Sequence, residues 1–186
     1  MWVQFEPSCI RVALDVSLQE LAAAQGMKVK EGAPLDAAEL LPAAEAHRAY
    51  LLQHLNVSIG TLALSGSVLT VSPPAKTVDP ERTFYQYELE YPFSAPPPYE
   101  VRFYHDMLKE WPYAPGIPWE VGYIVRTKRS DSDTVSSWLL SSQKNTDLLT
   151  GWGNVEGPPL QKGAEQSPED SFLKKLWQAF LRFFQP

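Results

Sequence analysis

The sequence predicts a mainly β protein of the α+β class, an antiparallel β-sandwich for which an immunoglobulin-like arrangement is one candidate form. Several stretches alternate apolar and polar residues with a period of two, the pattern of strands with one buried face. Seventeen of the 186 residues are proline, which disfavours a helical bundle or a parallel doubly wound sheet because proline interrupts helices and central strands. The length suffices for one core without disulfides.

The domain organisation follows from shifts in composition along the chain. We expect one β-sandwich domain over residues 1–152, with a helical insertion at about 18–55. Residues 153–167 are rich in Gly and Pro and poor in apolar residues, so they are predicted to form a linker. An amphipathic helix is expected over residues 168–186.

The first strand and the first helix have clear local signals. Alternation over residues 10–16 predicts a strand. Ser17 then suits the N-cap of a short helix over residues 18–25, and Glu20, at the third helical position, predicts a reciprocal capping box. Gly26 is expected to end this helix.

A second helix is predicted over residues 36–55, where apolar residues recur near helical spacing. Pro42 is expected to kink or restart it. Beyond it the pattern changes to β. Two short apolar runs, 59–64 and 68–71, flank Ser65-Gly66-Ser67 and predict a hairpin.

The longest strand is predicted over residues 83–93, with one face of tyrosines and leucine opposite a polar face. Further strands are expected over 99–105, 119–127 and 134–140. The polar residues 128–133 between the last two predict a charged hairpin tip, because the Gly and Glu of a calcium loop are missing there.

The C-terminal segment combines a wide apolar stripe with a basic face. Residues 171–186 contain three cations and no acid, a charge of +3. This pattern is typical of a helix at a membrane interface, and it also fits a tail helix that packs on its own domain. The expected interface residues are Phe172, Lys174, Lys175, Trp177, Phe180, Arg182, Phe183 and Phe184.

Composition excludes several function classes. A formal net charge of -6 argues against nucleic-acid binding. Cys9 is the one cysteine, so neither an internal disulfide nor a thiolate metal cluster is available, and we interpret it as a buried apolar residue. We expect no cofactor.

The three histidines do not form an obvious catalytic or metal site. His47 and His54 are seven residues apart on the second predicted helix, about 10 Å along its axis, too far to share one ion, and a solvated helix face is the better interpretation. His105 and Asp106 are strand neighbours that point to opposite faces. No Gly-x-Ser-x-Gly, Walker or His-Glu-x-x-His motif occurs. We therefore expect no enzyme, with a small hydrolase using His105 as an alternative.

A loop rich in proline and aromatic residues follows the strand that ends near residue 105. It is a candidate binding edge, because rigid exposed rings lose little entropy on contact. The other interpretation is a plug that closes one end of the sandwich. The candidate binding residues are His105, Trp111, Tyr113 and Trp119.

The order of these features, with the loop His105-Asp106-Met107-Leu108 and Tyr113-Ala114-Pro115-Gly116-Ile117-Pro118-Trp119, resembles the extracytoplasmic N-terminal domain of HupE/UreJ-like bacterial membrane proteins. The resemblance implies a signal peptide before the domain, Met1 as an added start, and a multi-helix membrane domain after the C-terminal helix. The family's histidine motif, linked to nickel or cobalt, lies in the membrane domain, so no metal ligand is transferred to this chain.

We therefore expect a non-enzymatic extracytoplasmic domain, periplasmic or on the outer cell face, that binds or regulates something beside its membrane domain. Its expected partner is that membrane domain or a membrane surface, and the sequence does not identify a protein or small ligand. The alternative is a peripheral protein whose C-terminal helix inserts into lipid. A cytoplasmic location stays open because residues 1–7 do not form a signal peptide.

Overall fold

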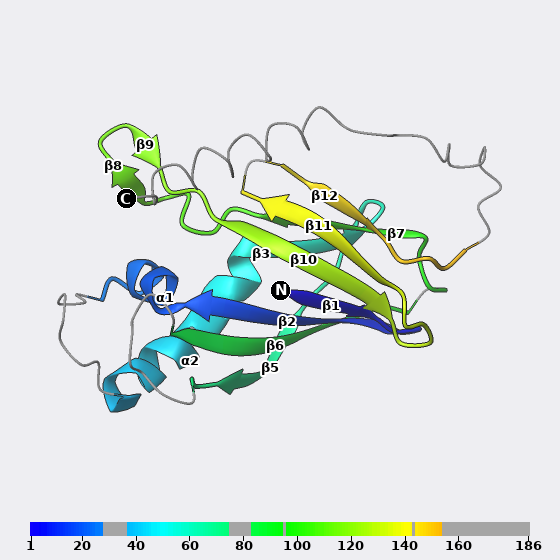
Figure 1. Ribbon diagram of the computed structural model, residues 1–186, viewed down its shortest axis with the longest axis horizontal. Coiled ribbons are helices and arrows are strands. Elements are labelled where there is room, and N and C mark those ends of the chain that lie inside the picture. Colours follow the sequence, from blue (N-terminus) through cyan, green and yellow to red (C-terminus); the bar gives the residue numbers. More distant parts are fainter. Residues whose placement is uncertain (28–36, 75–82, 95, 143, 154–186) are drawn as a thin grey trace, which may run out of the picture. The chain divides into compact units, whose positions relative to one another are not determined.

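The computed structural model describes residues 1–27, 37–74, 83–94, 96–142 and 144–153. Within them the protein has a β-rich α+β fold with two larger, mostly antiparallel sheets and two helices (Figure 1). The predicted C-terminal helix, and all of the predicted linker except Gly153, lie outside the described residues.

Strands distant in the sequence are neighbours in both larger sheets. The six-stranded sheet has the order β11 (Val135–Ser141), β10 (Gly122–Arg129), β1 (Trp2–Phe5), β2 (Cys9–Ser17), β6 (Phe84–Pro92), β5 (Ser67–Ser72). The four-stranded sheet has the order β12 (Thr146–Leu149), β7 (Glu100–His105), β3 (Leu55–Ile59), β4 (Leu62–Ala63). A separate small sheet joins β8 (Pro112–Ala114) to β9 (Ile117–Pro118).

The sheets are mostly antiparallel, as expected, and β1 makes the parallel pairing among them. This strand lies between β2, with which it is antiparallel, and β10, with which it is parallel. This strand carries no clear signal in the sequence, because four residues are too few for a visible alternation. Its inward side chains, Val3 and Phe5, are nevertheless buried in the core.

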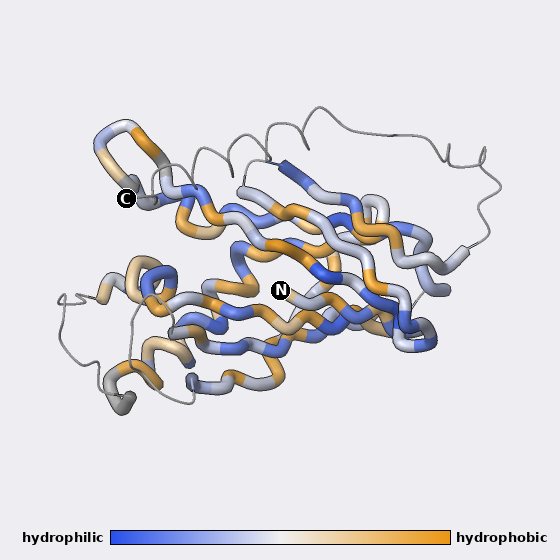
Figure 2. Tube along the Cα trace, in the orientation of Figure 1, coloured by the Kyte–Doolittle hydropathy of each residue, from blue (hydrophilic) through white to orange (hydrophobic). Residues whose placement is uncertain are grey.

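The buried faces of the strands follow the predicted alternation, which Figure 2 shows as changes of hydropathy along the chain. On β6, the tyrosines and leucine at positions 85, 87, 89 and 91 are buried, and the polar residues between them face outward. Buried residues of both larger sheets and both helices belong to one hydrophobic cluster. One continuous core therefore stabilises the described domain.

The first helix, α1 (Leu18–Ala24), begins as predicted, because the Ser17 hydroxyl accepts a hydrogen bond from the Glu20 N–H at 3.1 Å. The reciprocal bond of the predicted capping box, from the Ser17 N–H to the Glu20 side chain, is not the contact that the Glu20 carboxylate makes. The Glu20 carboxylate is buried and accepts a hydrogen bond from the Tyr123 hydroxyl, because tertiary packing turns it into the core. Gly26, with φ of 63°, follows the helix as expected.

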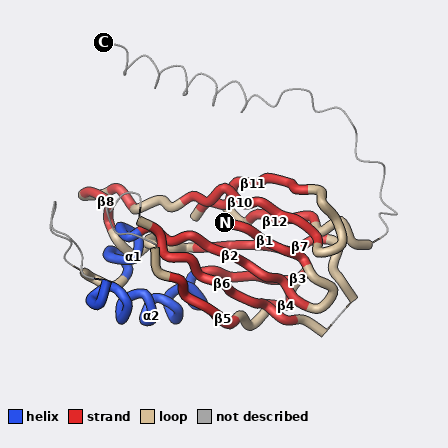
Figure 3. Tube along the Cα trace, turned by 60° about the horizontal axis from the view of Figure 1, so that its bottom comes forward, coloured by secondary structure: helices blue, strands red, loops and turns tan. Residues whose placement is uncertain are grey.

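The second helix, α2 (Ala37–His54), contains Pro42 and continues directly into β3 at Leu55. Both helices lie at the same end of the six-stranded sheet (Figures 1 and 3). The turn between β10 and β11 lies at the opposite end, where Arg129 pairs with Phe5.

The predicted hairpin around residues 65–67 is wrong. The hairpin joins β3 to β4 through Gly60 and Thr61, whereas β5 pairs with β6 in the other sheet. Residues 64–66 therefore carry the chain from one sheet to the other. Gly66 is required at this crossing because a Cβ there would lie 2.4 Å from the Tyr91 ring.

We predict that Gly66→Ala destabilises the protein by about 1–3 kcal/mol, because the added methyl group overlaps a buried ring that cannot withdraw. Gly122→Ala is the matched control, since the nearest atom to its Cβ would be the Leu140 carbonyl oxygen at 3.9 Å. Denaturant midpoints of the two variants measure the difference. Equal destabilisation by both substitutions would contradict the close packing of Gly66 on Tyr91.

Candidate functional site

His47 is buried, so its predicted place on a solvated helix face is wrong. Its Nδ1 lies 3.3 Å from Nε2 of Gln25, and its ring stacks on Tyr50 at 5.0 Å and lies 5.6 Å from the Tyr87 ring. Its Nε2 has no hydrogen-bond partner within the described part of the chain. Desolvation lowers the pKa of His47 to about 4, so the ring is neutral at pH 7.

His54 is the more accessible histidine of α2, and it pairs with Asp106. Its Nδ1 lies 2.8 Å from the Asp106 carboxylate, and its carbonyl accepts a hydrogen bond from the Asp106 N–H. The Tyr50 ring lies 4.2 Å away. Asp106 is therefore hydrogen-bonded to His54, whereas neither ring nitrogen of His105 has a hydrogen-bond partner among the described residues, and Asp106 joins the loop to the end of α2.

His105 is fully buried at the end of β7, with the Tyr123 ring at 5.3 Å. Desolvation lowers its pKa to about 4, opposed by the nearby Leu140 carbonyl, which does not reach hydrogen-bond geometry with either ring nitrogen. No hydroxyl or thiol is hydrogen-bonded to His105 among the described residues. The hydrolase alternative and a ligand contact at His105 therefore gain no support from this arrangement.

The aromatic loop combines a buried base with an exposed tip. Met107 and Leu108 are buried, and the Leu108 N–H donates to the Tyr50 hydroxyl at 2.7 Å. Trp111 is 42% exposed, and Trp119 is half-buried and donates its backbone N–H to the Trp111 carbonyl. The buried base of the loop therefore packs against the core, as the plug interpretation expects, and ligand binding by the exposed tip stays a prediction.

The fourth predicted binding residue, Tyr113, lies on β8, and its side chain is outside the described part of the structure.

Glu20 forms a second buried polar contact at the helical end. Its carboxylate accepts a hydrogen bond from the Tyr123 hydroxyl at 2.6 Å, and the Met107 sulfur lies 3.2 Å from the same hydroxyl. Desolvation raises the pKa of Glu20 to about 7, while the Tyr123 hydrogen bond opposes the shift. Perturbed titratable groups mark functional sites and structural networks alike. Here Glu20, Tyr123 and Met107 contact one another inside the core, as in a structural network.

The opposite end of the domain contains a polar cleft of about 310 Å³. Its walls come from the β10–β11 hairpin, from the end of β12 and from Phe5 on β1. The lining residues are Phe5, Thr127, Lys128, Arg129, Ser132, Thr134, Ser136, Leu149, Thr150 and Gly151. We call this the hydroxyl cleft.

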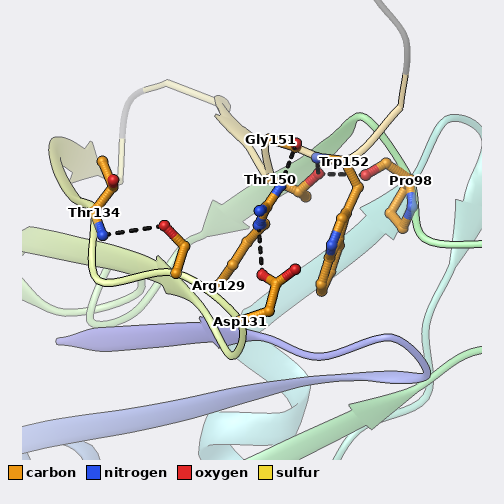
Figure 4. Close-up of polar contacts among 8 residues, drawn as sticks. Pro98, Arg129, Asp131, Thr134, Thr150, Gly151 and Trp152 are labelled. Atoms are coloured by element: carbon orange, nitrogen blue, oxygen red, sulfur yellow. Dashed lines mark hydrogen bonds and ion pairs between the residues drawn. The ribbon is translucent and has the colours of Figure 1, made fainter.

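Arg129 joins the two walls of the hydroxyl cleft (Figure 4). Its Nε donates to Asp131 at 2.7 Å, and a terminal nitrogen donates to the Gly151 carbonyl at 2.6 Å. Its guanidinium carbon lies 5.8 Å from the centre of the Trp152 ring. Arg129 therefore holds the β10–β11 hairpin against the chain that leaves β12.

Thr150 fixes the second wall from within. Its hydroxyl lies within hydrogen-bond distance of the Pro98 and Tyr99 carbonyls and accepts from the Trp152 N–H at 3.1 Å (Figure 4). Its own N–H donates to the Tyr99 carbonyl at 2.9 Å. The rim of the cleft is thus preorganised by the protein itself.

A second cavity of about 300 Å³ lies on the six-stranded sheet and is lined in part by Trp2, Ala13 and Leu69. Trp2 is 42% exposed, and the Arg126 guanidinium lies 5.6 Å from the centre of its ring. This groove is more apolar than the hydroxyl cleft, and its polar lining residues are Gln4, Arg11, Glu88 and Lys128.

The hydroxyl cleft was not predicted from the sequence. The prediction of a charged hairpin tip at residues 128–133 is correct locally, since Arg129 pairs with Asp131 and Lys128 lies near Asp133. Thr150 carried no local signal. Pairing of β12 with β7 and of β1 with β10 creates the cleft, and neither pairing is visible in a single sequence.

Among the residues that the structure describes, no group of three or more His, Cys, Asp or Glu side chains is arranged to hold a metal ion. None of the described helices has the length and apolar character needed to cross a membrane. Comparison of the chain with protein-family models, curated proteins and solved structures finds no match.

The buried titratable groups predict a defined pH dependence of folding. Unfolded Glu20 loses its proton near pH 4.5 but folded Glu20 keeps it to about pH 7, so raising the pH through this range removes stability. Unfolded His47 and His105 bind protons near pH 6.5 but folded ones only near pH 4, so lowering the pH removes stability. Between about pH 4.5 and 6.5 the unfolded state therefore binds roughly one proton more than the folded state, because on unfolding two histidines gain protons and one carboxyl loses its proton. The free energy of unfolding then rises by about 1.4 kcal/mol per pH unit.

Glu20→Gln should roughly double this slope, because the opposing carboxyl is removed. His105→Leu should make the slope nearly flat. Denaturant titrations at constant ionic strength between pH 4.5 and 6.5 measure it. A slope that stays the same in both variants would show that these groups do not titrate as their burial implies.

Proposed function

We propose that this chain is a non-enzymatic binding domain on the extracytoplasmic side of a membrane, joined there to a membrane domain. The main observation that supports the proposal is the position of the hydroxyl cleft. Two of its lining residues, Thr150 and Gly151, lie two to three positions before the predicted linker, which leads to the predicted juxtamembrane helix. A ligand in the cleft would contact the part of the chain that continues toward that helix, which suits a module that binds or regulates something beside the membrane.

Two further observations support the proposal. The loop that carries the resemblance to HupE/UreJ-like proteins is anchored to α2 by the His54–Asp106 pair, so it is an ordered part of the domain. None of the described histidines is hydrogen-bonded to a serine, threonine or cysteine side chain, which favours binding over nucleophilic catalysis.

We also propose that the two larger sheets pack face to face as a β-sandwich. Their inward residues share one hydrophobic cluster, which supports two packed layers. The strand order, with β1 between β10 and β2, differs from the two-sheet order of an immunoglobulin domain. An immunoglobulin-like form therefore gains no support, and the proposed sandwich has its own topology.

The competing function is a peripheral protein that attaches reversibly to anionic lipid through residues 168–186. The wide apolar stripe and basic face of that segment favour it as much as they favour a juxtamembrane role. The full reading frame of the gene distinguishes the membrane-tethered form from the peripheral form. The tethered form predicts a signal peptide before Met1 and apolar membrane spans after Pro186, and a frame bounded by those two residues would leave only the peripheral form.

Vesicle flotation tests the membrane role of the C-terminal segment. We expect the full chain to float with vesicles that contain anionic lipid, and Phe180→Asp to reduce binding by tenfold or more, because burial of a phenylalanine contributes about 1.5–3 kcal/mol. Gln178→Asp is the control, since it makes the same charge change on the polar face. An unbound wild-type chain, or equal loss in both variants, would refute the interfacial helix.

A further inference from the structure

We propose that the second cavity, on the outer face of the six-stranded sheet, binds a peptide of two or three residues that has free termini and an apolar side chain. We call this cavity the Ala13 groove. Its outward-facing lining residues are Trp2, Gln4, Arg11, Ala13, Leu69, Glu88 and Lys128. The inference goes beyond the proposed function, because the groove is a different site from the hydroxyl cleft.

Ala13 forms the floor of the groove because its neighbours on the adjacent strands are larger. In the sheet register it lies opposite Trp2 of β1 and Glu88 of β6. Directly opposed residues of antiparallel strands face the same side, so these three side chains all lie on the outer face. The volume of about 300 Å³ lies at the lower end of the range for small-molecule sites, about 300–1,000 Å³.

Two exposed apolar side chains flank this floor. Trp2 is 42% exposed and Leu69 is 45% exposed, and in the strand order they lie on either side of β2. A tryptophan ring offers a large contact area at a low cost in conformational entropy. The groove is therefore suited to an apolar side chain of a ligand.

The β10 side of the groove is positively charged. Lys128 lies opposite Gln4 in the register between β1 and β10, which places its side chain on the outer face. Its ion-pair partner Asp133 is 3.8 Å away and fully exposed, so this pair contributes little and the carboxylate of a ligand can replace it. Arg126, which lies against the Trp2 ring, adds a second cation at this side.

The β6 side of the groove is negatively charged. Glu88 is exposed, and one of its carboxylate oxygens accepts a hydrogen bond from the Thr70 hydroxyl at 3.1 Å. This neutral donor leaves the negative charge in place, and the second oxygen can accept from the ammonium group of a ligand. The charge of Arg11, between the two sides, is balanced by Glu6 at 3.2 Å and Glu90 at 3.5 Å.

The ligand thus needs a negative and a positive group, with a spacing that the strands set. Three strand spacings separate β10 from β6, about 14 Å at about 4.8 Å each. The side chains of Lys128 and Glu88 both line the groove, so their charged ends narrow this span. Two or three extended residues cover about 7–10 Å. A simple acid would leave Glu88 without a partner, whereas a peptide with free termini matches both sides.

The full chain is titrated with the tripeptide Ala-Leu-Ala, with its N-acetylated form, with its C-terminal amide and with Gly-Gly-Gly, and binding is followed by amide chemical shifts. We expect Ala-Leu-Ala to shift amides of residues 2–4, 11–13, 88, 89 and 128. Each blocked peptide should bind about tenfold more weakly, because it loses one charge-assisted hydrogen bond. Gly-Gly-Gly should bind at least several-fold more weakly, because it buries no apolar side chain.

Variants combined with blocked peptides test the orientation of the ligand. Lys128→Gln should weaken binding of Ala-Leu-Ala about tenfold and leave binding of the C-terminal amide unchanged, because the amide has no carboxylate for Lys128 to hold. Glu88→Gln should weaken binding of Ala-Leu-Ala about tenfold and leave binding of the N-acetylated peptide unchanged, for the corresponding reason at the ammonium end.

A further variant tests the floor of the groove. Ala13→Leu should abolish detectable binding of Ala-Leu-Ala, because the larger side chain occupies the space above Ala13. Ser72→Leu is the matched control, since Ser72 is exposed on β5 opposite Gln86, faces the same side of the sheet and does not line the groove. The unfolding midpoint of each variant shows whether it is folded.

The proposal is overturned if Ala-Leu-Ala does not bind, if the shifted amides lie outside the groove, or if folded Ala13→Leu binds as tightly as the wild type. It is also overturned if the N-acetylated peptide binds as tightly as Ala-Leu-Ala, which would indicate a site for simple acids, or if the C-terminal amide does, which would indicate a site for simple amines. Vesicle flotation is unaffected by these outcomes, so failure of this site and failure of the proposed membrane-side function are distinguishable.

Discussion

Two buried tyrosine hydroxyls of β6 connect the parts of this fold. Tyr87 donates to the Ala44 carbonyl in α2 at 2.9 Å, and Tyr91 donates to the Leu55 carbonyl at the start of β3 at 3.3 Å. An unsatisfied buried hydroxyl would cost about 1–3 kcal/mol, so these contacts select one position of α2 and β3 relative to the six-stranded sheet. Gly66 packs on the ring of the same Tyr91.

The two ends of the domain differ in what their polar side chains do. At the helical end polar side chains are buried in the core: His47 stacks on Tyr50 beside the tilted ring of Tyr87, and Glu20 accepts a hydrogen bond from Tyr123. Burial there shifts the pKa values of Glu20, His47 and His105, which the core encloses. At the other end, Arg129 and Thr150 hold the walls of the hydroxyl cleft. The buried groups with shifted pKa values therefore lie at the helical end, and the hydroxyl cleft lies at the other end.

The departures from the sequence-based predictions share one cause. A local signal specifies what a residue is able to do, and long-range contacts decide which of its options is used. Glu20 had the position of a capping residue, but Tyr123, over a hundred residues later, holds its carboxylate. His47 had the spacing of an exposed helix face, but Tyr87 and Gln25 enclose it.

The sequence by itself determined the β-rich class, the alternating buried faces, the Ser17 cap and the two helices, because these depend on residues within a few positions of one another. Tertiary structure alone decided the parallel pairing of β1 with β10, the crossing at Gly66 and the hydroxyl cleft. Residues far apart in the chain, such as Arg129 and Gly151, form that cleft. Their meeting depends on strand order, which period-two alternation does not encode.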